Sequence, residues 1–186
     1  MATDDVSPPA PDRCSCEHVP APLSPEGKGA ALLGFLVPVV TVHAHVDHVF
    51  GRIEARWPNE PPEGANWIPD VWLAFTRGLY GLAEAMRLFT DYVLLEVGMQ
   101  DPGIGVRTPE GPTVPQSLDA IGQQLMVLHE QVRILLPAGT PALDRARSRL
   151  SVAIGDLQAL ETHGEALERA LVAPPDAPAR PAGETP

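Results

Sequence analysis

The residues of this chain whose types and spacing could do chemistry begin with one short string, HAHVDH, at residues 43–48. Three imidazoles and one carboxylate occur there within six positions, and these are side chains that bind zinc and other transition metals. On a helix, His43 and Asp47 share one face because they are four residues apart, and His45 and His48 share another. The pair His43 and Asp47 is therefore the candidate for a metal site on a helix.

The same string resembles the HxHxDH signature of the metallo-β-lactamase superfamily, including the apolar residues VVTV before it and Gly51 after it. The resemblance implies a strand that leads into the string, a fold in which strands alternate with helices, and a hydrolase site with two zinc ions. The later ligands of that family come from strand ends. In this chain His129 and His163 both lie inside long helical patterns.

The apolar spacing around the string predicts a helix instead. Apolar positions recur in alternating steps of four and three residues, which is a heptad seam with His43 on its core side. On this interpretation Asp47 lies near His43, while His45 and His48 lie on a solvated face. The seam consists of Leu32, Leu36, Val39, His43, Val46, Phe50, Ile53 and Trp57. A metal inside a bundle would draw on inward-facing side chains of several helices, and the candidates are His43, Asp47, Glu96, His129 and Glu130.

A second string, CSCEH at residues 14–18, places two thiols and one imidazole close together. Zinc binds such ligands, but its cysteines usually have more residues between them and are joined by a second ligand pair. Cys14, Cys16 and His18 therefore predict a weak zinc site or one shared with a partner chain. A disulfide between the two cysteines would be strained, which favours a reducing compartment.

Composition limits the partners. The net charge is -11 and the isoelectric point is about 4.8, so nucleic acids and anionic lipid surfaces are disfavoured by repulsion. The longest apolar run, residues 30–42, is shorter than a membrane span, and the N-terminus lacks the layout of a signal peptide. The abundance of Ala, Pro and Gly suggests a bacterial or phage source. We expect the chain in the cytoplasm or within a virion or other large intracellular assembly.

Three further seams predict three more helices. The four predicted helices span residues 25–57, 69–99, 116–136 and 141–172. Ser24 and Thr140 are the expected N-caps of the first and fourth, each with a proline at the first helical position. Pro38 is expected to kink or divide the first helix. The turn at residues 137–139 is so short that the third and fourth helices must be antiparallel neighbours.

These patterns predict an all-α fold, namely an antiparallel four-helix bundle (residues 24–172) of long heptad-patterned helices. Proline-rich tails, residues 1–23 and 173–186, are expected to be disordered or extended. We find no phosphate loop, nucleophile elbow or Ser-His-Asp arrangement. The function expected is that of a non-enzymatic structural or adaptor component, with protein partners and a homo-oligomeric or larger assembly. No cofactor is expected beyond the candidate zinc or other transition metal. The alternatives are a metal-binding bundle and the hydrolase that the resemblance implies.

Overall fold

The computed structural model describes residues 24–58, 68–100 and 109–174, and within these ranges all regular structure is helical. The expectations for residues 1–23 and 175–186, which include Cys14, Cys16 and His18, lie outside the described residues. The predicted all-α class is confirmed. The four helices are α1 (Pro25–Arg56), α2 (Ile68–Glu96), α3 (Val114–Leu135) and α4 (Pro141–Val172).

Side-chain caps begin three of the helices. The Ser24 hydroxyl accepts the Gly27 backbone N–H at 3.1 Å, and the Thr140 hydroxyl caps α4 in the same way. Both predicted N-caps are confirmed. α3 begins earlier than the sequence interpretation placed it, because Thr113 and Gln116 form a capping box in which each side chain accepts the other's backbone N–H. The spacing T-x-x-Q was a readable signal for this start.

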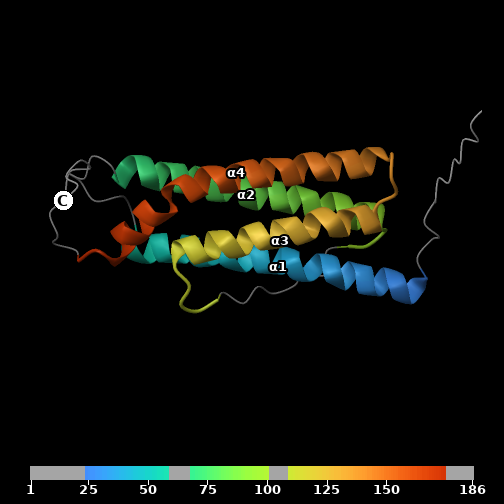
Figure 1. Ribbon diagram of the computed structural model, residues 1–186, viewed down its shortest axis with the longest axis horizontal. Coiled ribbons are helices and arrows are strands. Elements are labelled where there is room, and N and C mark those ends of the chain that lie inside the picture. The colour runs from blue at the N-terminus through green and yellow to red at the C-terminus, as the bar shows by residue number, and fades with distance from the viewer. Residues whose placement is uncertain (1–23, 59–67, 101–108, 175–186) are drawn as a thin grey trace, which may run out of the picture.

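Neighbouring helices of the bundle are antiparallel. α1 lies beside α3, α3 beside α4 and α4 beside α2, and α1 and α2 close the ring more loosely (Figure 1). The directions follow from close approaches: Gly34 meets Gln131, Gly164 meets Leu118, and Gly78 meets Leu160. α2 and α3 therefore run in the same direction, so the last residue of α2 and the first residue of α3 lie at opposite ends of the bundle.

The core extends along the whole bundle, and the predicted seams of α2, α3 and α4 supply most of it. Phe35 and Phe89 pack with their ring centroids 5.4 Å apart across the bundle. In the predicted seam of α1, Leu32, His43 and Phe50 are only half-buried, while Val42 and Val49, which the seam left out, are fully buried. This stretch of α1 is apolar on several sides, so the neighbouring helices select which side is buried.

Pro38 does not divide α1, which is a single helix from Pro25 to Arg56. A proline ring crowds the backbone four residues earlier in a helix. That position is Gly34, where the missing Cβ leaves the backbone more room. Gly34 also lets α3 approach, because a Cβ there would lie 3.1 Å from the Gln131 side-chain oxygen.

Of the described helices, α1 alone is long and apolar enough to cross a membrane by those two criteria. The apolar run at residues 30–42 led to the expectation that no segment is long enough to cross a membrane. The stretch without charged residues is longer than that run, because it continues past His43 and His45 to Val46. The core helix of a bundle meets the same criteria. Phe35, Val42 and Val49 of α1 are fully buried against the other helices.

Candidate functional site

The string at residues 43–48 is helical throughout and lies in the middle of α1. The strand that the metallo-β-lactamase resemblance implies before the string is therefore not there. Asp47 is exposed and His43 is half-buried, while His45 and His48 are half-buried rather than on a solvated face. His48, which was predicted to lie on a solvated face, instead lies against the backbone just before α3, because its Nε2 is 2.9 Å from the Pro112 carbonyl oxygen.

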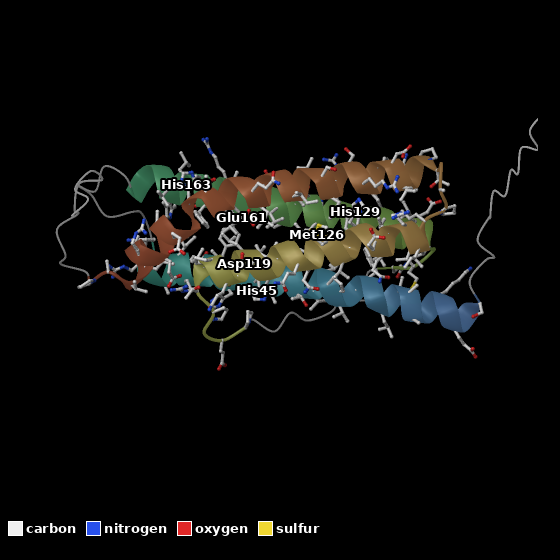
Figure 2. All side chains as sticks on the ribbon, in the orientation of Figure 1. His45, Asp119, Met126, His129, Glu161 and His163 are labelled. Atoms are coloured by element: carbon white, nitrogen blue, oxygen red, sulfur yellow. The ribbon has the colours of Figure 1, made fainter. Side chains whose placement is uncertain are left out.

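The other predicted metal ligands do not converge. Glu96, His129 and Glu130 are exposed, and His129 and His163 lie well apart along the bundle (Figure 2). In the part of the chain that the structure describes, no group of three or more His, Cys, Asp or Glu side chains is placed to hold a metal ion. Metal binding by His43 and Asp47 stays a prediction, as it does for the cysteine string.

Three helices meet in a polar cluster at the C-terminal end of α1. The Arg52 guanidinium donates to both carboxylate oxygens of Glu168 on α4, at 2.6 and 2.9 Å. Glu168 also accepts the Val114 backbone N–H at 2.7 Å, at the first residue of α3. His48 Nε2 lies 2.9 Å from the Pro112 carbonyl oxygen. We call Arg52, Glu168 and the Val114 N–H the three-helix clasp.

The electrostatics of the clasp favour an ionised Glu168. Its pKa is lowered chiefly by the hydrogen bond from Arg52, with help from the Val114 N–H and against a raising effect of burial. The first N–H groups of a helix have no partner inside the helix and carry a partial positive charge. One carboxylate therefore caps α3 and neutralises an arginine of α1 at the same time.

His45 lies one helical turn before His48 on α1. Burial lowers the pKa of His45, and the charge of His48 lowers it further. Its Nδ1 is buried and has no hydrogen-bond partner among the described residues. The neutral imidazole is favoured here because a proton on His45 would be poorly solvated and would face a second imidazole.

The sequence interpretation missed the clasp. It placed Glu168 with Asp156, Glu161 and Glu165 on a solvated face of α4, yet Glu168 and Asp156 are partly buried. Spacing held a signal: Glu168 follows the seam residue Gly164 by four positions, so the two share one side of α4. His45, His48 and Arg52 likewise repeat at steps of three and four. Neither spacing indicates that the α1 residues meet the α4 residues, because Arg52 and Glu168 are 116 residues apart in the sequence.

A hollow of about 430 Å³ lies between α3 and α4. The two helices approach closely there, because a Cβ on Gly164 would lie 3.1 Å from Leu118 Cδ1. Asp119 on α3 and Glu161 on α4 lie on its two sides (Figure 2). Glu165 adds a third carboxylate. This acidic rim repels anions, but the carboxylates alone specify no ligand.

An apolar surface lies on the outside of α1 and α3, away from the clasp. The Gly34–Gln131 contact and the antiparallel direction of the two helices set Val37 of α1 level with Val127 of α3, one turn along the bundle. Leu33 precedes Gly34 on α1, and Ile134 follows Gln131 on α3. This pair is therefore on the other side of the Gly34–Gln131 contact along the bundle from Val37 and Val127. We call Leu33, Val37, Val127 and Ile134 the outer face; they are 64%, 61%, 41% and 52% exposed.

The clasp and the outer face are the two features that stand out in the described part of the molecule. No protein-family model, curated protein or solved structure matches the chain. In the clasp, the charges of Arg52 and Glu168 neutralise each other, and these contacts stabilise the junction of three helices. The outer face leaves apolar area uncovered, and apolar area of this kind binds other apolar surfaces.

Proposed function

We propose that this chain is a non-enzymatic structural or adaptor component of a larger assembly, of bacterial or phage origin, that binds protein partners. The observation that carries the proposal is the outer face, four large apolar side chains on two adjacent helices. Single exposed apolar residues are common on protein surfaces, whereas a contiguous group marks an interaction site. Helix faces of this kind dock against complementary helices or grooves.

The α1 part of the outer face also lacks the charges that would oppose docking. The chain carries a net charge of -11, but no Asp, Glu, Lys or Arg occurs from Gly29 to Val46 of α1. Desolvating charged side chains would cost free energy on association, and this stretch of α1 avoids that cost. Depletion of charge is what distinguishes the centre of a protein interface from the rest of a surface.

Contacts with the other helices hold α1 in place, so the outer face is ordered before any partner binds. α1 is anchored at its C-terminal end by the clasp and, at Arg56, by a 2.9 Å hydrogen bond to the carbonyl oxygen of Ala173, the C-cap residue of α4. Nearer its other end, Phe35 packs on Phe89 of α2. A surface that is already ordered loses less conformational entropy on binding.

The finer features of the sequence interpretation belong to the same proposal. The helices continue their heptad seams as in a coiled coil, which favours shallow packing angles and association with further helices. Residues 1–23 and 173–186 act as extended tethers that order along a partner. Limited proteolysis of the chain with and without its partner tests the tethers, which become protected only in the complex.

The experiment that tests the function compares variants of the full chain in its source cells. Tagged wild type, Leu33→Glu and Leu95→Glu are crosslinked and purified, and the captured proteins are quantified by mass spectrometry. Leu95 is the matched control, because it is a 79% exposed leucine on α2. We expect one set of partners with wild type and Leu95→Glu, and about tenfold less with Leu33→Glu. Equal capture by all three proteins, or no capture, contradicts the proposal.

A further inference from the structure

We propose that the occupant of the outer face is a second copy of this chain, related to the first by a two-fold axis. The inference rests on the proposed function and names the partner that this surface takes. Two-fold pairs, in which the same patch serves on both copies, are the commonest assemblies of soluble proteins. The charges, the position of the uncharged stretch and its area each bear on this choice.

Charge restricts where two copies can meet. Each copy carries a net charge of -11, so most orientations bring like charges together. On α1, Lys28 and Asp47 mark the limits of a stretch without Asp, Glu, Lys or Arg. On α3, the nearest acidic residue to Ile134 is Glu130, and it is paired with Arg133 at 3.2 Å. The outer face is therefore a place where two acidic copies can approach with little repulsion.

The position of Val37 suits a two-fold axis. It lies at the middle of the uncharged stretch from Gly29 to Val46. An axis beside Val37 sets the two α1 helices antiparallel, with the uncharged stretch of one copy along that of the other. Leu33 of each copy then faces the region of Thr41 on its partner, and neither helix places a charge against the other within the stretch.

The available area fits a weak, reversible pair. The uncharged stretch is about 27 Å long at the helical rise of 1.5 Å per residue. Two helices side by side are about 20 Å wide, so each copy offers roughly 500 Å² and the pair buries about 1,000 Å². This is at the lower limit for a specific protein interface. For a pair of this size we expect a dissociation constant in the micromolar range, so that the pair dissociates on dilution.

A lipid surface is the competing occupant, and the structure favours the second copy over it. α1 cannot enter a bilayer as a span while its other side forms the core, because Phe35, Val42 and Val49 are fully buried against neighbouring helices. Binding flat on a membrane surface is opposed by the net charge of -11 wherever the lipids are anionic.

The test measures the mass of the full chain by sedimentation and light scattering, from about 1 to 500 µM. We expect a monomer at the low end and a dimer at the high end. Val37→Glu and Leu33→Glu should each raise the dissociation constant by about 30-fold or more. Leu95→Glu should change it less than about twofold. Circular dichroism must show that the helical content of all three variants equals that of wild type.

Three results overturn the inference. One is a monomer at every concentration, and another is a dimer that both outer-face variants leave intact. The third is flotation of the wild-type chain, but not of Val37→Glu, with vesicles of neutral phosphatidylcholine, which assigns the face to lipid. If the purified chain is monomeric while Leu33→Glu still loses a partner captured from cells, the proposed function stands and the second copy is wrong. If the purified chain dimerises through the outer face but captures no partner from cells, the second copy stands and the proposed function is wrong.

Discussion

The two halves of α1 differ in the charge of their side chains and in what those side chains contact. Its C-terminal half carries His48, Arg52 and Arg56, and each of these side chains hydrogen-bonds to a carboxylate or carbonyl oxygen of another element of the chain. Its N-terminal half has no charge from Gly29 to Val46, and Leu33 and Val37 are exposed. In the C-terminal half the fold supplies partners for Arg52 and Arg56, whereas the stretch of the N-terminal half that leaves Leu33 and Val37 exposed carries no charge. We propose that the contacts of the C-terminal half stabilise the monomer and that the exposed surface of the N-terminal half serves association.

The largest effect on monomer stability is expected at the clasp. Glu168→Ala leaves the Arg52 guanidinium and the Val114 N–H without their acceptor, in a site where the side chains of Arg52 and Glu168 are only 24% and 15% exposed. We expect a loss of about 2 kcal/mol in the free energy of unfolding, measured by urea denaturation. Glu165→Ala, at an exposed position of the same helix, should stay within about 0.5 kcal/mol. Equal losses would show that the clasp adds nothing.

The clasp should also account for part of the loss in the free energy of unfolding at low pH. The pKa of Glu168 is below its usual 4.5 in the folded chain, chiefly because Arg52 donates to it. The unfolded chain therefore takes up a proton first, and the contribution of Glu168, complete above pH 4.5, is lost as the pH falls through the folded pKa. Glu168→Gln should show a shallower loss of stability with falling pH in urea titrations. An unchanged slope contradicts this assignment.

A smaller effect, of opposite sign, is expected at His45. Its buried Nδ1 has no partner among the described residues, so His45→Leu should raise the free energy of unfolding by about 1 kcal/mol at neutral pH. Burial and His48 lower the pKa of His45 from 6.5, so the wild type should lose stability as the pH falls below 6.5. The leucine variant should lose less over that range. His129→Leu is the control, because His129 is exposed; the same gain there would reject the explanation.

The smallest effect on monomer stability is expected at the outer face. Val37→Glu should change the free energy of unfolding by less than about 0.5 kcal/mol, because the side chain is 61% exposed. The measurement is a urea titration at a concentration low enough to keep the chain monomeric. A loss as large as that of Glu168→Ala would show that Val37 is part of the monomer's core contacts and would remove the contrast between the two halves of α1.

The sequence was most informative where apolar and polar positions alternate clearly. The predicted seam residues of α2 from Phe75 to Val93, and of α3 from Leu118 to Val132, are all buried. The same pattern was less exact in α1, where Leu36, Val39, Val46, Ile53 and Trp57 are buried as predicted but His43 is only half-buried, and Val42 and Val49, which lie outside the seam, are fully buried. A seam is readable only against a polar background, and α1 has almost none between Gly29 and Val46.

By itself, the sequence determined the all-α class, the four helices and the caps at Ser24 and Thr140, because helical periodicity and capping depend on residues close together in the chain. Only the tertiary structure decided that Val42 and Val49 of α1 are fully buried while His43 is not, that α2 and α3 run in the same direction, and that Arg52 meets Glu168. Those outcomes depend on contacts between residues far apart in the sequence, and no local pattern records which distant helix will be the neighbour.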